Sequence, residues 1–193
     1  CSDPSRMSNV VGVARAAQRD WAALSDTVRL SLLNRFLTSL SARAQDIARS
    51  ITIEQGKPLA EAQGEIAKAL DESAQMLASA GRPGGAVHAT ARMGVIPFTL
   101  RHPRGVIAAL TPWNFPALSP LRKIVPALAF GNAIILKPSE LSPAAACIIA
   151  EVAGDVLPRG IFQLVIGGAR IFRGVGLGSR VRGNYLTRAV GSG

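Results

Sequence analysis

Apolar residues recur at helical intervals between residues 10 and 80, and polar residues fill most of the positions between them. The pattern predicts four amphipathic helices, over about residues 10–21, 28–40, 44–55 and 59–80. We expect the second to be capped near Ser25 or Asp26, and the third to end at Gly56, a residue suited to the left-handed end of a helix. The chain is therefore expected to open with a helical part, which we assign to residues 1–91.

After about residue 92 the apolar positions form short runs instead of helical stripes. The run over 95–101 is interrupted by Pro97 and indicates an edge strand. Three further runs predict strands, at residues 105–110, 133–136 and 162–165, with helical patterns between them over about 117–130 and 143–153. Alternating strands and helices predict an α/β fold, with the first half of a doubly wound parallel sheet over 105–166.

The last part of the chain, residues 167–193, has a different composition. The whole sequence carries a net charge of +10, and half of this excess lies in 167–193, which is rich in glycine and arginine and has no acidic residue. Two interpretations stay open: a basic arm that contacts phosphates, or a stretch that is not the native continuation of the domain. The glycines of 174–178 form only a partial phosphate-binding fingerprint, because no predicted strand leads into them.

Composition limits the class of protein further. Its 193 residues are 48% hydrophobic, which is enough to bury a core and excludes disorder driven by charge. The two cysteines, Cys1 and Cys147, exclude a disulfide scaffold and a multi-cysteine zinc site, and they favour a cytoplasmic setting. His88 and His102 stand alone, so we expect no metal site. The longest uncharged stretch contains three prolines, so we expect no membrane span, and a first residue other than Met hints at a fragment.

The segment Thr111–Pro116, TPWNFP, directly follows the first predicted buried strand. Its two prolines bracket Trp113, Asn114 and Phe115 in a stiff loop. A fixed amide N–H at the carboxyl end of a strand can stabilise an oxyanion, and loss of such a donor costs about 3 kcal/mol of transition-state stabilisation. The alternative is a turn in which Asn114 caps the following helix.

A second polar segment, KPSE at Lys137–Glu140, follows the next buried strand. Lys137 can donate to the hydroxyls of a nucleotide ribose, and Glu140 can accept from them. Glu140 would also repel a 2′-phosphate, which favours NAD over NADP. The alternative is that Ser139 and Glu140 simply begin the next helix.

Together these segments resemble the cofactor domain of the aldehyde dehydrogenase superfamily over about residues 10–166. The resemblance rests on motifs in the family's order, namely Thr111–Pro116, Lys123, Pro126–Leu128, Gly131–Asn132 and Lys137–Glu140. Upstream segments resemble the signature EQGKPxxEAxGE and the lead-in to PWNFP, at Glu54–Pro58, Glu61–Ala62, Gly64–Glu65, Pro103, Gly105 and Val106. The chain is identified as an N-terminal fragment of a family member, with an incomplete Rossmann-like sheet.

The resemblance implies a role for each motif residue. Asn114 would be the oxyanion-hole donor, and Thr111 and Trp113 would line the nicotinamide-ribose side of the pocket. Lys137 and Glu140 would hold the adenosine ribose. The activity implied is oxidation of an aldehyde or semialdehyde to a carboxylic acid with NAD, NADP being possible. The spacing of Arg92 to Thr111 is similar to that of members acting on semialdehydes.

The family's chemistry also needs a thiolate and a water-activating carboxylate, and both come later in the family's chain than this sequence reaches. Cys147 lies in an apolar helix and is expected to be a small buried residue. We therefore expect this chain to be inactive alone. The resemblance implies a β-hairpin over 92–104 at a subunit interface, hence homo-oligomers of the full-length parent. The alternatives are a non-catalytic binding module whose basic tail engages nucleic acid or another polyanion, and a regulatory pseudo-subunit.

Overall fold

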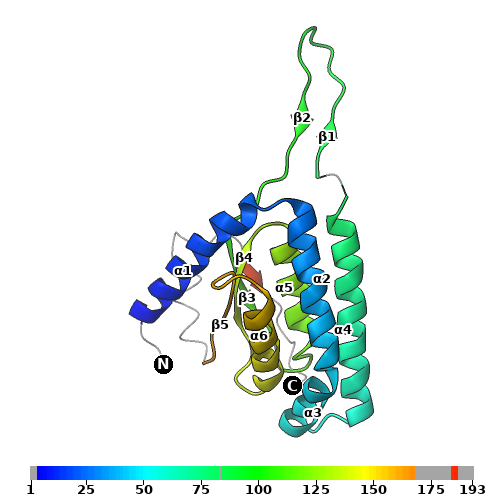
Figure 1. Ribbon diagram of the computed structural model, residues 1–193, viewed down its shortest axis with the longest axis vertical. Coiled ribbons are helices and arrows are strands. Elements are labelled where there is room, and N and C mark those ends of the chain that lie inside the picture. Colours follow the sequence, from blue (N-terminus) through cyan, green and yellow to red (C-terminus); the bar gives the residue numbers. More distant parts are fainter. Residues whose placement is uncertain (1–3, 83, 168–183, 187–193) are drawn as a thin grey trace, which may run out of the picture.

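The computed structural model describes residues 4–82, 84–167 and 184–186 (Figure 1). Its helices are α1 (Pro4–Ala23), α2 (Asp26–Ala42), α3 (Ala44–Gln55), α4 (Leu59–Ala80), α5 (Leu118–Ala129) and α6 (Ala144–Val156). Its strands are β1 (Ala86–Val87), β2 (Phe98–Thr99), β3 (Val106–Leu110), β4 (Ala133–Lys137), β5 (Phe162–Leu164) and β6 (Asn184–Leu186).

A parallel sheet with the strand order β5-β4-β3-β6 forms the centre of the fold. Helix α5 connects β3 to β4, and α6 connects β4 to β5, so consecutive strands are joined by the helical crossovers that parallel pairing requires. Residues 133–137 are all buried, as expected for a strand covered on both faces. The expected α/β fold with the first part of a doubly wound sheet is confirmed.

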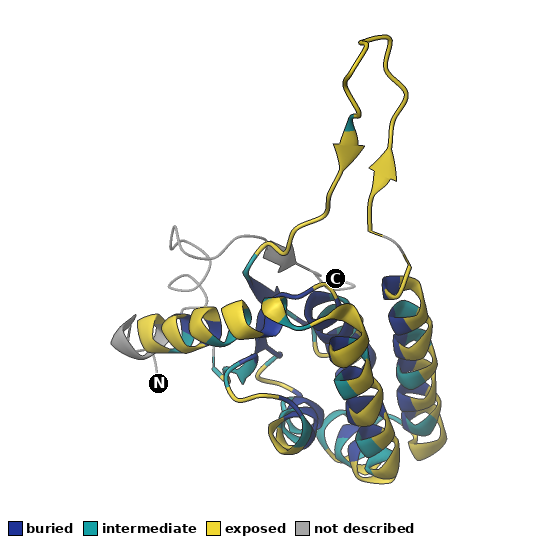
Figure 2. Cartoon of the chain, turned by 45° about the horizontal axis from the view of Figure 1, so that its top comes forward, coloured by how far each residue is buried: buried dark blue, intermediate teal, exposed yellow. Residues whose placement is uncertain are grey.

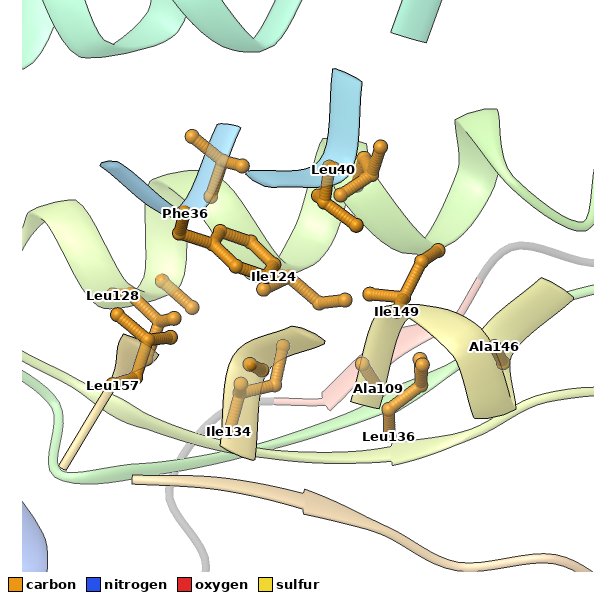
Figure 3. Close-up of a cluster of buried hydrophobic side chains, with 14 of the residues drawn as sticks. Phe36, Leu40, Ala109, Ile124, Leu128, Ile134, Leu136, Ala146, Ile149 and Leu157 are labelled. Carbon is orange, nitrogen blue, oxygen red and sulfur yellow. The ribbon is translucent and has the colours of Figure 1, made fainter. Parts of the chain in front are cut away.

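One apolar core joins the sheet to the helices around it. Figure 3 shows Phe36 and Leu40 of α2 meeting Ile124 of α5, Ile149 of α6 and Ile134 of β4. Helix α1 contacts β3, β4 and β5. The N-terminal helices are therefore part of the same packed unit as the sheet, because they cover apolar surface that the crossover helices leave exposed.

The N-terminal helices follow the predicted pattern closely. The hydroxyl of Ser25 accepts a hydrogen bond from the backbone N–H of Val28, which caps α2. Helix α3 ends at Gly56, whose φ of +71° is the left-handed conformation that glycine adopts without strain. Helix α1 begins at Pro4, earlier than expected. The prediction placed its start near Val10 because the apolar stripe of the helix starts only there.

Strands β1 and β2 form an antiparallel hairpin that projects away from the rest of the fold (Figure 1). The expected edge strand over 95–101 is only two residues long, and it starts after Pro97, which has no N–H to donate. The other strand, Ala86–Val87, lies in the range that we assigned to the helical part. Two-residue strands are held by hydrogen bonds to each other and have no periodicity of their own, so the sequence pattern could not show β1.

Residues 184–186 pair in parallel with β3 as strand β6, where the sequence pattern predicted no element. The pairing is made through backbone groups, which leave no trace in the order of apolar residues. The glycine fingerprint at 174–178 and most of the expected basic tail lie outside the described residues. Within the part of the chain that is described, no helix is long and apolar enough to cross a membrane.

Candidate functional site

The two polar segments meet at the carboxyl ends of β3 and β4. Leu110 and Lys137 are partners in the register of the two strands, and the N–H of Thr111 donates to the carbonyl of Lys137 at 3.2 Å. Thr111 and Lys137 are both buried. The parallel sheet thus brings the start of TPWNFP and the start of KPSE side by side, at the edge where ligands bind in open α/β sheets.

The TPWNFP loop contains two buried polar atoms without a protein partner. They are the hydroxyl oxygen of Thr111 and the side-chain oxygen of Asn114, and they are the two such side-chain atoms found among the described residues. An unpaired buried polar atom costs about 1–3 kcal/mol. Two on one loop at the end of a sheet indicate a place prepared for a ligand or for water.

Asn114 does not cap α5, so that alternative interpretation is wrong. The helix has no cap from its neighbouring side chains, and its first N–H groups are bound instead by Glu65 of α4. The Glu65 carboxylate accepts from the N–H of Ala117 at 2.9 Å and from that of Leu118 at 3.2 Å. The Asn114 side chain is therefore not used by the helix.

Aromatic side chains flank Asn114 on both sides. Trp113 is 50% exposed and Phe115 is 45% exposed. The backbone beneath them is fixed: the carbonyl of Trp113 accepts hydrogen bonds from Gln55 and from the Ser142 hydroxyl, the latter at 3.1 Å. The loop therefore presents two aromatic faces from a held backbone.

The α3–α4 connection reaches this loop through Lys57. Its ammonium donates to the carbonyl of Asn114 at 3.0 Å and to Glu65 at 2.5 Å, and it lies 4.9 Å from the centre of the Phe115 ring. The sequence motifs included Lys57, Gln55 and Glu65 without assigning them a function. Their spacing along the chain gave no sign that they contact a loop more than 50 residues away.

Lys137 and Glu140 form the second part of the site. The Lys137 ammonium donates to the carbonyl of Pro138 at 3.0 Å and to the Glu140 carboxylate at 3.1 Å, which leaves one of its three N–H donors for a ligand. The pKa of Glu140 is lowered, first by a hydrogen bond from its own backbone N–H and then by Lys137. Glu140 is half exposed and ionised at neutral pH, so it can accept hydrogen bonds from hydroxyl groups.

Helix α6 starts only at Ala144, so Ser139 and Glu140 do not begin it and that alternative is also wrong. Ser139 instead accepts a hydrogen bond from the N–H of Leu141 in a turn. The N–H of Ala144 is bound by both carboxylate oxygens of Glu54, at 2.9 and 3.2 Å. Glu54 and Glu65 therefore play equivalent structural roles. Each belongs to the α3–α4 region, and its carboxylate binds backbone N–H groups at the start of a crossover helix.

These residues fit a nucleotide cofactor. The unpaired Thr111 hydroxyl, the remaining Lys137 donor and the Glu140 carboxylate offer both donors and acceptors to ribose hydroxyls at one sheet edge. A cavity of about 860 Å³ lies elsewhere, lined by residues that include Arg101, Arg104 and Lys123. We place the candidate site at the ends of β3 and β4 because the unpaired polar atoms and both motifs converge there.

Cys147 does not supply a nucleophile under neutral conditions. It lies half-buried on α6, and burial raises the pKa of its thiol, with a smaller contribution from the charge of Glu54. His88 contacts the Thr99 hydroxyl across the hairpin. In the described ranges, no group of three or more His, Cys, Asp or Glu residues could hold a metal ion.

Comparison with known proteins identifies the family. A family model described as the aldehyde dehydrogenase family matches residues 2–177. A glutarate-semialdehyde dehydrogenase of Pseudomonas aeruginosa is 40% identical over 77% of this chain and 31% of the relative. A succinate-semialdehyde dehydrogenase (NADP(+)) of Escherichia coli is 37% identical over 93% of this chain and 36% of the relative.

A solved structure agrees with these sequence matches. The crystal structure of an aldehyde dehydrogenase from Brucella melitensis biovar abortus has a TM-score of 0.91 and 35% identity, and the match covers 94% of this chain and 38% of that chain. The resemblance inferred from the motifs is thus confirmed. The chain spans about a third of the length of the curated relatives that it matches.

Proposed function

The chain belongs to the aldehyde dehydrogenase family, and on this basis we propose that it forms the cofactor-binding and oxyanion-stabilising part of an NAD(P)+-dependent oxidoreductase. The reaction proposed is the oxidation of an aldehyde or semialdehyde to a carboxylic acid. One observation carries the proposal: two buried, unpaired polar atoms lie on the TPWNFP loop, beside Lys137, at the carboxyl ends of β3 and β4.

Asn114 is the proposed oxyanion donor. The side-chain oxygen of its amide is buried without a hydrogen-bond partner in the described part of the chain, and its backbone carbonyl accepts from Lys57. An amide N–H held in this way can donate to the aldehyde oxygen as negative charge builds on it. Such a donor contributes about 3 kcal/mol to the stability of the transition state.

Thr111, Trp113, Lys137 and Glu140 are the proposed cofactor residues. Lys137 and Glu140 hold the hydroxyls of the adenosine ribose, and Thr111 and Trp113 line the nicotinamide-ribose side. The bound NAD(P)+ would supply the hydride acceptor. The ionised Glu140 disfavours a 2′-phosphate, so we propose NAD as the preferred cofactor and NADP as possible.

The same proposal assigns no turnover to the 193 residues by themselves. The sequence contains two cysteines; Cys147 remains a thiol at neutral pH, and Cys1 lies outside the described residues. In keeping with the family resemblance, which puts the nucleophile later in the chain, we propose that the thiolate that attacks the aldehyde comes from outside this sequence. The names of the relatives support a semialdehyde as substrate. The reducing, cytoplasmic setting expected from the cysteine content stays part of the proposal.

The hairpin is the proposed contact with a second copy in the full-length parent. Val87, Ile96, Phe98 and Leu100 are all exposed on it. Figure 2 shows that the projecting hairpin is exposed along almost its whole length. Several neighbouring exposed apolar residues on one projecting element are typical of an association surface.

Cofactor binding is the direct test. NAD+ is titrated into the purified chain while tryptophan fluorescence is followed, and the change is expected to saturate and to be absent in Trp113→Phe. Lys137→Met should weaken binding about tenfold or more, because a hydrogen bond from a charged group is lost. Asn114→Ala is the matched control, since it contacts the substrate and should leave the affinity for NAD+ unchanged. The proposal is rejected if the unmodified chain shows no saturable binding.

A further inference from the structure

We propose that Lys57 and Glu65 are positioning residues that fix the backbone on both sides of Phe115 and thereby aim the side chain of Asn114. The idea rests on the proposed function for the role of Asn114 itself. It adds a pair of residues that touch neither substrate nor cofactor and act through the TPWNFP loop.

The two side chains form a clamp around a short piece of chain. Glu65 binds the N–H groups of Ala117 and Leu118 through one carboxylate oxygen and the Lys57 ammonium through the other. Lys57 in turn donates to the carbonyl of Asn114. Backbone atoms of residues 114 and 117 are thus connected through one ion pair, so the intervening segment cannot change its length or direction freely.

The surroundings of the pair argue for a geometric role. The Glu65 side chain is 2% exposed and that of Lys57 is 17% exposed, so both charges are largely removed from water. A buried ion pair adds little stability compared with apolar residues of similar size, because desolvation offsets the attraction. The pair instead fixes the direction of the backbone. Apart from the bond between the two side chains, all of its hydrogen bonds go to backbone atoms of residues 114–118.

A helix cap alone does not account for this arrangement. Glu65 could bind the start of α5 without a lysine, since a carboxylate suits the positive end of a helix. Lys57 nevertheless reaches past Glu65 to the Asn114 carbonyl and lies over the Phe115 ring. Gln55, two residues before Lys57, holds the adjoining carbonyl of Trp113. Two successive carbonyls of the loop are therefore held by donors from the same connection.

Precise placement matters for an oxyanion donor. The donor must lie within hydrogen-bonding distance of one position of the substrate oxygen, and displacement by about 0.5 Å is enough to weaken a prepared site. The side-chain oxygen of Asn114 has no hydrogen-bond partner in the described residues that could hold the side chain in position. Its aim therefore depends on its backbone, which the Lys57–Glu65 clamp holds.

The test uses the whole chain without cofactor, so it does not depend on NAD+ binding. The double variant K57M/E65Q removes the ion pair without leaving a buried charge. The amide oxygen that E65Q introduces still accepts from the α5 N–H groups, but a neutral oxygen binds them more weakly than a carboxylate does. Lys57→Arg keeps the charge and a donor and serves as the conservative rescue. Glu72→Gln is the matched control, because Glu72 pairs with Arg122 across the same two helices, α4 and α5, away from the loop.

Two signals are measured by nuclear magnetic resonance: exchange of the amide hydrogens of Ala117 and Leu118, and the order parameter of the Asn114 side-chain NH2 group. In K57M/E65Q we expect about tenfold faster exchange relative to the amides of β3 and β4, together with a lower Asn114 order parameter. Lys57→Arg should keep both signals close to those of the unmodified chain, and Glu72→Gln should change neither.

Two outcomes would overturn the inference. Faster exchange with an unchanged Asn114 order parameter would make Glu65 a helix cap only. Equal acceleration in β3 and β4 would show a loss of overall stability without a specific effect on the loop. Failure of NAD+ to bind the chain would leave both signals intact, so it would count against the proposed function alone.

Discussion

The Lys57–Glu65 pair also gives the sharpest prediction for stability, tested by replacing Lys57 with methionine. The substitution keeps most of the side-chain volume but leaves the Glu65 carboxylate, 2% exposed, without its cation. Removing one partner of a buried ion pair costs about 3–5 kcal/mol of unfolding free energy. Because Lys57 is 17% exposed and partly solvated, we expect the lower end of that range, about 3 kcal/mol.

Urea unfolding followed by circular dichroism measures this loss, with the two single variants and K57M/E65Q forming a double-mutant cycle. The double variant should recover to within about 1 kcal/mol of the original chain, since no charge is left buried. Arg122→Met is the control, because the Arg122–Glu72 pair is partly exposed and screened by water, so it should contribute little to stability. If Lys57→Met costs no more than Arg122→Met, the pair is solvated and the reasoning fails.

Three further predictions concern other parts of the structure. Gly160→Ala should destabilise the chain by about 2 kcal/mol more than Gly56→Ala in the same urea assay: both glycines have positive φ, but a Cβ at 160 would lie 3.0–3.3 Å from atoms of α1, while at 56 it meets nothing. Equal losses would contradict this packing. The affinity for NAD+, measured by calorimetric titration, should be full above pH 4.5, the ordinary pKa of the Glu140 carboxyl. It should fall as the pH drops through the lowered pKa of Glu140 in the folded chain. The E140Q variant should not show this fall. In a Cys1→Ser variant, a thiol reagent at pH 8 should modify Cys147 more slowly in the folded chain than in urea, because the folded state raises its thiol pKa; equal rates would refute this.

Strong local signals in the sequence predicted the elements that hold the site. The end of α3 at Gly56 and the buried strands β3 and β4 follow from one glycine and two continuous apolar runs, and the structure has them where they were expected. The carboxyl ends of these strands also identified the loops to examine, because the chain direction in a parallel sheet puts both ends at one edge.

The elements that the sequence did not reveal are those held by pairing alone. Strand β1 consists of Ala86 and Val87, and β6 covers residues 184–186; both exist through hydrogen bonds to another strand. The sequence also left open whether Asn114 caps α5, because a helix cap and a ligand-binding amide require the same residue type. The structure excludes the cap, because Glu65 of a different helix binds the first N–H groups of α5; the ligand contact of Asn114 stays a proposal.

The sequence by itself therefore determined the family, the order of the helices and of strands β3, β4 and β5, and which side chains we propose for the chemistry, since each depends on local patterns or ordered motifs. Tertiary structure alone decided what holds those side chains in place. Lys57 lies 57 residues from Asn114, and Glu65 lies 52 residues from Ala117. Contacts over such separations arise only when α4 packs against α5, because hydrogen bonds are made by atoms close in space, and no periodicity along the chain records them.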